Sequence, residues 1–128
     1  MLSKLLLTTI GYTITTFALA VVWHLILFGE IYEKIGYIGR EEPGFLLGLA
    51  SIITQGAVLS YLYPKFKNGL HLIIAMGIFH WSMHVVAAAA KNQINHIPLF
   101  FGMETVYLIV QFGLAAGVFA LVYRRDIT

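Results

Sequence analysis

Residues 92–123 read NQINHIPLFFGMETVYLIVQFGLAAGVFALVY, and this stretch decides the fold class. It lies between Lys91 and Arg124, and Glu104 is the only charged side chain within it. A helix needs about 20 mainly apolar residues to cross a bilayer, so the stretch is long enough for one crossing and too short for two. It therefore predicts one transmembrane helix that carries an ionisable group.

Three other stretches have no charged residue and similar lengths. They are residues 5–29, 43–64 and 68–90, with 25, 22 and 23 residues. Lipid cannot satisfy the backbone groups of open strands, so each stretch predicts a helix. Short loops between them make sequential helices antiparallel neighbours. We therefore expect an all-α integral membrane protein, a single domain over residues 1–128, built as an antiparallel four-helix bundle with helices at about Leu5–Phe28, Phe45–Tyr63, Gly69–Ala90 and Leu99–Tyr123.

The composition agrees with this class. Charged residues make up 11% of the chain and apolar residues 59%, with a mean hydropathy of +0.84. A soluble domain carries about 25% charged residues, so these values exclude a soluble enzyme, a disordered chain and a nucleic-acid-binding module. The absence of cysteine excludes Fe–S clusters and covalently attached haem. No nucleotide-binding fingerprint or nucleophile elbow is found, and we expect a protein that is not a stand-alone enzyme.

The basic residues are divided unequally between the two sides of the predicted bundle. Five lie on the side of the termini and three on the other, and cytoplasmic loops carry the excess of Lys and Arg. This count predicts that both termini are cytoplasmic. The first apolar run is longer than the core of a signal peptide, so we expect it to stay in place as a membrane anchor. The five are Lys4, Lys65, Lys67, Arg124 and Arg125, and the three are Lys34, Arg40 and Lys91.

The end of the first predicted helix has a recognisable pattern: Trp23, four residues, Phe28-Gly29, two residues and Tyr32. This pattern resembles a family of small four-helix bacterial membrane proteins of unknown function. The resemblance implies a four-helix fold and the bacterial inner membrane, and it implies no reaction. The chain departs from the family at His24, where the family has a tyrosine. The resemblance therefore does not support His24 as a ligand.

Polar residues at membrane depth are the candidate functional residues, because ionisable groups there are costly and often functional. At 1.5 Å per residue, one layer lies roughly 6–9 Å below the outer boundary and a second lies about one helical turn deeper. Residues four or seven apart share a helix face, so one histidine is expected to meet the glutamate and the other to meet a glutamine. The outer layer is His24, His84 and Glu104, and the deeper layer is Gln55, His80 and Gln111, with the expected pairs His84–Glu104 and His80–Gln111.

Three interpretations of these residues stay open. The first is an interhelical hydrogen-bond network of the glutamines and Glu104 that fixes the bundle geometry. The second is a cofactor site, either a haem or quinone head group at His24, His80 and His84, or a transition metal at His80, His84 and Glu104, because imidazole suits Zn, Cu and Fe. The third is a proton path in a small transporter, with Glu104 as the proton carrier.

Two motifs of small residues predict close helix contacts. They are Gly44-x-x-x-Gly48 and Gly113-x-x-x-Gly117, and such spacing lets two helix backbones approach. The contact is expected either inside the bundle or with another protein. The chain has no soluble catalytic domain, so the leading prediction is a protein that acts through helix contacts. It would be an accessory subunit of a membrane complex or a self-associated oligomer.

Overall fold

The computed structural model describes residues 1–36 and 44–124, and every element within these ranges is helical. The four predicted helices are confirmed to within a few residues. Four helical segments are long and apolar enough to cross a membrane: Leu2–Leu27, Phe45–Lys65, Gly69–Lys91 and Ile97–Tyr123. The last begins two residues before the expected start, because Pro98 fits the first turn of a helix, where its missing N–H is not needed. Of the basic residues counted above, Arg40 and Arg125 lie outside the described residues.

Two of the four segments change their winding part of the way along. The first joins α1 (Leu2–Val21) to a π-helical segment, η1 (Val22–Leu27). The third joins α4 (Gly69–Trp81), a second π-helical segment, η3 (Ser82–Val86), and α5 (Ala87–Lys91). The other two segments are α3 (Phe45–Leu62) with the short 3₁₀ turn η2 (Tyr63–Lys65), and α6 (Ile97–Tyr123). The two π-helical segments were not expected from the sequence.

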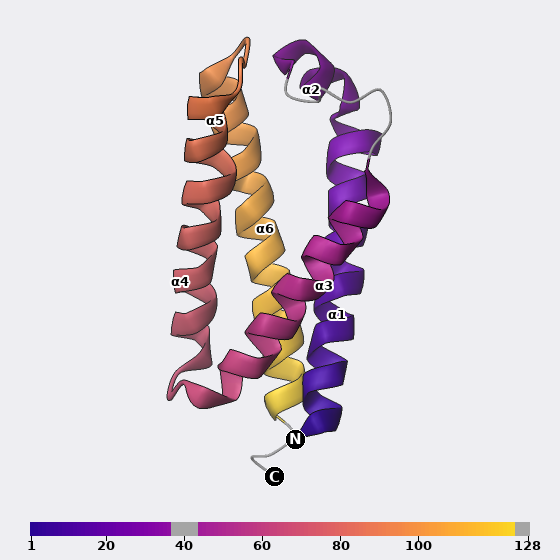
Figure 1. Ribbon diagram of the computed structural model, residues 1–128, viewed down its shortest axis with the longest axis vertical. Helices are drawn as coiled ribbons and strands as arrows, with labels where there is room; N and C mark the ends of the chain where they lie inside the picture. Colours follow the sequence, from indigo (N-terminus) through magenta and orange to yellow (C-terminus); the bar gives the residue numbers. More distant parts are fainter. Residues whose placement is uncertain (37–43, 125–128) are drawn as a thin grey trace.

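The four helical segments run alternately up and down, so Met1 and the end of α6 lie at the same end of the bundle (Figure 1). We refer to the opposite end as the α2 end. Helix α1 packs on α3 and on α6, and α6 packs in turn on α4. Helix α3 crosses the bundle diagonally and approaches α4 near their connecting turn (Figure 1). Helices α1 and α6 therefore form the centre of the bundle.

A short helix, α2 (Gly29–Ile35), occupies part of the segment that was expected to be a loop. The side chains of Tyr32 and Ile35 are fully buried, so α2 covers the end of the bundle. It ends at Gly36, whose left-handed conformation (φ 71°) is the usual one for a glycine that terminates a helix. The Asn95 backbone N–H donates to the Ile35 carbonyl oxygen over 3.0 Å. This bond ties α2 to the loop between α5 and α6.

The two predicted small-residue motifs make no close contact inside the described chain. A Cβ atom placed on Gly48, Gly113 or Gly117 would meet no atom within 4 Å, and Gly44 is exposed. The helices approach closely at other glycines: Gly11, Gly56 and Gly77. The internal contact expected at the two motifs is therefore wrong, and contact with another protein stays a prediction.

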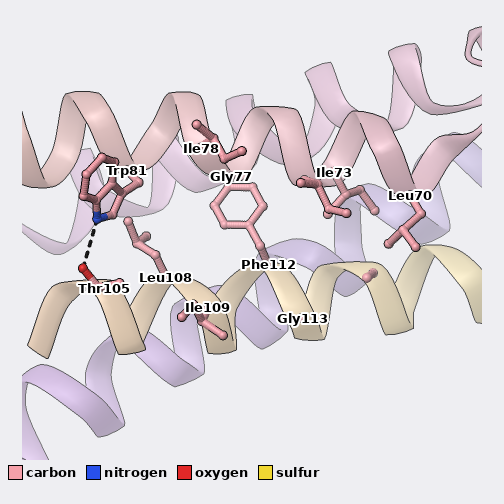
Figure 2. Close-up of a pocket in the computed structure, with 12 residues that line it drawn as sticks. Leu70, Ile73, Gly77, Ile78, Trp81, Thr105, Leu108, Ile109, Phe112 and Gly113 are labelled. Carbon is pink, nitrogen blue, oxygen red and sulfur yellow. Dashed lines mark hydrogen bonds between the residues drawn. The ribbon is translucent and has the colours of Figure 1, made fainter. Parts of the chain in front are cut away.

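Two grooves flank the contact between α4 and α6. The larger, of about 380 Å³, runs between these two helices from Leu70 to Trp81 (Figure 2). The smaller, of about 220 Å³, lies between α3 and α4. The Phe112 ring lines both grooves and packs against Gly77, where an added Cβ would lie 3.2 Å from the ring. Phe112 is thus the shared wall between the two grooves.

Candidate functional site

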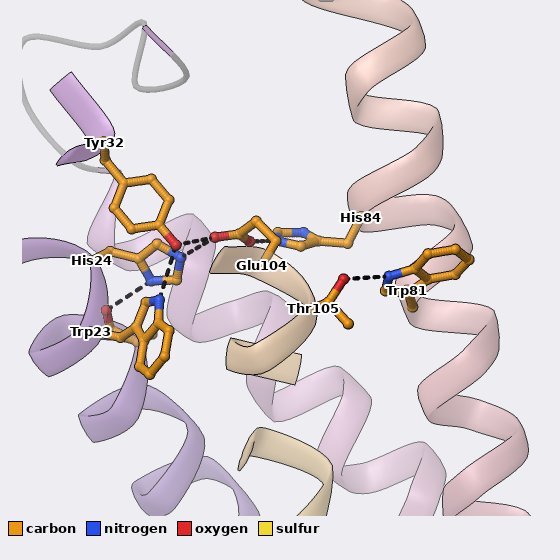
Figure 3. A network of polar contacts seen from close by, with 8 residues as sticks. Trp23, His24, Tyr32, Trp81, His84, Glu104 and Thr105 are labelled. Atoms are coloured by element: carbon orange, nitrogen blue, oxygen red, sulfur yellow. Dashed lines mark hydrogen bonds and ion pairs between the residues drawn. The ribbon is translucent and has the colours of Figure 1, made fainter. Parts of the chain in front are cut away.

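Glu104 on α6 is the centre of a polar cluster near the α2 end. Its side chain is fully buried, yet it contacts side chains from three other elements (Figure 3). His24 Nε2 on η1 lies 3.0 Å from Oε1, and His84 Nε2 on η3 lies 2.6 Å from Oε2. The Tyr32 hydroxyl on α2 donates a short hydrogen bond to Oε1. We refer to these four residues as the Glu104 cluster.

Both histidines of the cluster lie in the π-helical segments. A π-helical turn is wider than an α-helical one, so it changes the direction of the side chains that follow. Such turns are rare and occur frequently at functional sites. In this bundle they occur in two different helices, at the level where each faces Glu104. The local winding is therefore part of what directs His24 and His84 toward one carboxylate.

Tyr32 is held in place from a second direction. The Trp23 Nε1–H donates to the Tyr32 hydroxyl oxygen over 2.9 Å, and that hydroxyl donates in turn to Glu104. The His24 ring packs beside the Tyr32 ring, with centroids 4.7 Å apart. Burial raises the pKa of the Tyr32 phenol above its ordinary value, and the hydrogen bond to Glu104 raises it further. Tyr32 is therefore a neutral hydrogen-bond donor to the carboxylate.

The contacts of His24 set the number of protons in the cluster. Its Nδ1 lies 3.0 Å from the Ala20 carbonyl oxygen, which only accepts hydrogen bonds, so Nδ1 carries a hydrogen. The opposite nitrogen, Nε2, faces Oε1 of Glu104. A lone pair on Nε2 facing an ionised oxygen would be repulsive. One proton must therefore lie between these two atoms, either on a cationic His24 or on a neutral Glu104.

His84 completes the cluster and is its most accessible member. Its Nε2 is within hydrogen-bond distance of Oε2, which leaves Nδ1 as a position for an additional proton. The side chain of His84 is 33% exposed and that of His24 is 20% exposed, whereas Glu104 is not exposed. The cluster thus has a buried acid between two partly exposed bases, which is an arrangement in which a proton can pass from one group to the next.

The structure brings His84 and Glu104 together, as their positions in the sequence predict, and it adds His24 to the pair. His80 stays outside the cluster, with its ring centroid 5.4 Å from that of His84 and 5.7 Å from that of Phe112. The expected pairing of His80 with Gln111 is wrong. Gln111 donates instead to the Tyr12 hydroxyl (3.0 Å), which donates to Gln55 (2.9 Å). We refer to Tyr12, Gln55 and Gln111 as the mid-span layer.

The geometry does not favour the predicted metal or haem ligands. Within residues 1–36 and 44–124, no group of three or more His, Asp or Glu side chains is arranged to hold a metal ion. The Nε2 atoms of His24 and His84 both point at Glu104, which occupies the space between the two rings (Figure 3). A haem between these rings would have to displace the carboxylate from that space.

Sequence reasoning missed Tyr32 as a member of the cluster. Tyr32 is part of the sequence pattern that begins at Trp23, but that pattern does not indicate a contact with Glu104. The contact depends on α2 folding back over the bundle, which places residues 72 positions apart in hydrogen-bond contact.

Comparisons of the chain with protein-family models, with curated proteins and with solved structures find no match. The resemblance to a family of small four-helix membrane proteins therefore stays a prediction.

Proposed function

We propose that this chain is a small integral membrane protein in which the Glu104 cluster binds and exchanges protons, as the proton site of a small proton-coupled transporter. The single observation that carries the proposal is the proton required between His24 Nε2 and Glu104 Oε1. That proton has two chemically satisfied positions on one 3.0 Å contact. Intramembrane ionisable groups commonly mark proton relays. In this chain His24, His84 and Glu104 come from three different spans.

Exchange begins at the accessible histidine. When the shared proton is on His24 and Glu104 is ionised, a proton that binds Nδ1 of His84 makes that ring cationic, and the ring then passes its Nε2 proton to Oε2 of Glu104 across 2.6 Å. Tyr32 donates to Oε1 throughout, which holds the carboxyl group in one orientation. The groups that face Glu104 from the elements packed on it are His24, Tyr32 and His84. Tyr107 on α6 and His80 on α4 are the next titratable neighbours.

Infrared spectroscopy of the protein in lipid nanodiscs tests the proposal. On acidification, the wild type is expected to gain a carboxylic acid C=O band that shifts in deuterium oxide, because Glu104 takes up a proton. Glu104→Gln removes that band. His96→Gln is the matched control, since His96 is an exposed histidine before α6 and has no contact with the cluster. Identical titrations of the wild type and Glu104→Gln would refute proton binding at this site.

Proteoliposomes test whether the exchange is coupled to passage across the membrane. An imposed pH gradient is expected to dissipate faster with the wild type than with protein-free vesicles, with a pH-sensitive dye as the reporter. Glu104→Gln and His84→Gln are expected to return the rate to that of empty vesicles, whereas His96→Gln keeps the wild-type rate. Equal rates for the wild type and Glu104→Gln would show that the cluster does not carry the flux.

We further propose a bacterial inner-membrane location with both termini cytoplasmic, on the basis of the five-to-three division of basic residues. The chain has no cysteine, so single cysteines report sidedness without interference. In intact cells, a membrane-impermeant maleimide is expected to label Gln93→Cys and to spare Ser3→Cys. The reverse labelling would invert the topology.

A second candidate function is assembly with another membrane protein or with a second copy, and one face of α6 favours it. Gly102, Gly113 and Gly117 lie on this face, and a Cβ atom on any of them would meet only open space. Open glycines let a neighbouring helix approach closely. Chemical cross-linking in native membranes is expected to trap a complex, and Gly113→Leu is expected to abolish it. Ala18→Leu, on the exposed side of α1, is the control, and equal cross-linking in both variants would exclude this face.

A further inference from the structure

The smaller groove, between α3 and α4, contains a histidine that the Glu104 cluster does not use. His80 and Gln55 line this groove, and each is the middle residue of its span, Gly69–Lys91 and Phe45–Lys65. At 1.5 Å per residue, both lie about 15 Å or more from either end of their helices. The groove is therefore at the middle depth of the bundle, where a bilayer offers no water to satisfy polar groups.

Two N–H groups in the groove, one on His80 and one on Gln55, have no acceptor among the described residues. Across the described ranges 1–36 and 44–124, no hydrogen bond reaches either ring nitrogen of His80, which makes only ring contacts. Gln55 Nε2 donates one hydrogen to Ser51 Oγ over 3.1 Å and has a second hydrogen to donate. Unpaired polar groups are costly in an apolar environment, so these two donors call for an acceptor from outside the chain.

The larger groove is different in this respect. Figure 2 shows that its polar side chains, Trp81 and Thr105, are bonded to each other, with Nε1 donating to Oγ1 over 3.0 Å. The rest of its lining is hydrocarbon, aromatic carbon and glycine. In the larger groove, the Trp81 N–H is therefore satisfied, and the hydroxyl hydrogen of Thr105 is the one side-chain donor of its lining without an acceptor among the described residues.

We infer that the smaller groove binds the head group of a lipid-soluble quinone. The two donors require carbonyl oxygens, and the depth in the bilayer requires an uncharged ligand. A cavity of about 150 Å³ admits benzene, so about 220 Å³ admits a substituted ring. The aromatic rings of Tyr12, Phe79 and Phe112 in the lining provide flat partners for such a ring. The open side of the groove allows the hydrocarbon tail to extend into the bilayer.

This inference does not depend on proton exchange at Glu104. The His80 and His84 rings are neighbours, so the groove adjoins the Glu104 cluster, but the inference concerns binding alone and includes no electron or proton transfer. Glu104→Gln is expected to lose the infrared titration and to keep quinone binding. The two proposals can therefore fail separately.

Binding is tested with the protein in nanodiscs and decyl-benzoquinone as the probe, by quenching of tryptophan fluorescence. Saturable quenching is expected for the wild type, because Trp81 is adjacent to the groove histidine. His80→Phe and Gln55→Leu are each expected to weaken binding about tenfold, equivalent to about 1.4 kcal/mol. Val58→Trp fills the groove from the exposed side of α3 and is expected to abolish saturable quenching. This variant keeps the test informative if His80→Phe does not fold.

Two controls make the result decisive. Ile74→Trp fills the larger groove and is expected to leave quinone binding unchanged. Decylbenzene, which has the same tail and no carbonyl group, is expected not to compete. The inference is overturned if decylbenzene competes equally, if Val58→Trp binds like the wild type, or if well-folded His80→Phe and Gln55→Leu both keep wild-type affinity.

Discussion

The mid-span layer and the Glu104 cluster are two polar layers in one bundle, and each connects three or more helical elements. In the mid-span layer, Tyr12 receives a hydrogen bond from Gln111 and donates one to Gln55, so three neutral side chains join α1, α3 and α6. In the Glu104 cluster, an acid contacts two bases and a phenol. The helices are regular at the mid-span residues and π-helical at both cluster histidines.

The two layers differ in the energetic cost of placing them in a membrane. Interhelical hydrogen bonds between neutral groups in membranes contribute about 0.6 kcal/mol on average, and they are sufficient to fix register. A charged residue costs about 2.5–3.5 kcal/mol at the helix centre on insertion scales, and Glu104 lies between that centre and the start of α6. Because the mid-span layer already links the helices without charge, register alone does not explain an acid with two bases. We propose titration of the cluster as the explanation.

Paired alanine variants at the two centres should show the largest effect. Glu104→Ala leaves the two cluster histidines and the buried Tyr32 without their common acceptor, and we expect a loss of about 3 kcal/mol, as for other broken buried pairs. Gln111→Ala removes one neutral donor and should cost about 1 kcal/mol. Reversible unfolding in mixed micelles measures both. Equal losses would mean that the two layers are energetically alike and would remove the basis of the comparison.

The two buried tyrosines provide a closer test, because each loses one donated and one accepted hydrogen bond when it becomes phenylalanine. Tyr32→Phe removes a bond to an acid and should cost about 2 kcal/mol, whereas Tyr12→Phe removes only neutral bonds and should cost about 1 kcal/mol. Tyr61→Phe, on an exposed side chain, is the control for loss of a hydroxyl. A larger loss of stability in Tyr12→Phe than in Tyr32→Phe would contradict the inference that the Glu104 cluster contains the stronger hydrogen bonds.

The contrast between the layers was only partly visible in the sequence. The four spans follow from the positions of charged residues, because charge is excluded from the apolar core. The meeting of His84 with Glu104 follows from their similar depths. Which face of each helix points inward does not follow, since lipid-facing and buried faces are equally apolar. Gly113 and Gly56 therefore look alike in the sequence, although the first borders the open larger groove and the second packs against Tyr12.

The rest of the site depends on non-local structure. A change from α- to π-helical winding at His24 and His84 has no marker in composition, and it alters which residues share a face. The position of Tyr32 depends on α2 and on its anchor at Asn95, about 60 residues further along the chain. Local patterns contain no information on contacts of this range, so both histidines were identified but the phenol was not.

Alkaline pH should reveal a smaller difference in stability, which depends on the hydroxyl of Tyr32. The pKa of Tyr32 is raised in the folded protein, so its stabilising contribution is complete below the unfolded pKa of about 10 and is lost as pH rises toward the folded value. Between about pH 9 and pH 11, the wild type should lose about 1.4 kcal/mol more stability than Tyr32→Phe. Unfolding of both proteins across this range measures the difference. Parallel curves would indicate a phenol with an ordinary pKa.

The smallest expected effect concerns the anchor that holds Tyr32 over Glu104. The Asn95 amide donates to the Lys34 carbonyl oxygen over 3.3 Å at an exposed position, so Asn95→Ala should cost about 0.5 kcal/mol. Hydrogen exchange should accelerate in α2, and only moderately, because the backbone bond from Asn95 to Ile35 remains. Exchange in the mid-span layer should not change. Asn92→Ala is the matched control, since the Asn92 side chain bonds only within its own helix, to the Ala88 carbonyl oxygen. Faster exchange around Gln111 in Asn95→Ala would show that the two layers are one cooperative unit, and their separate roles would then have to be abandoned.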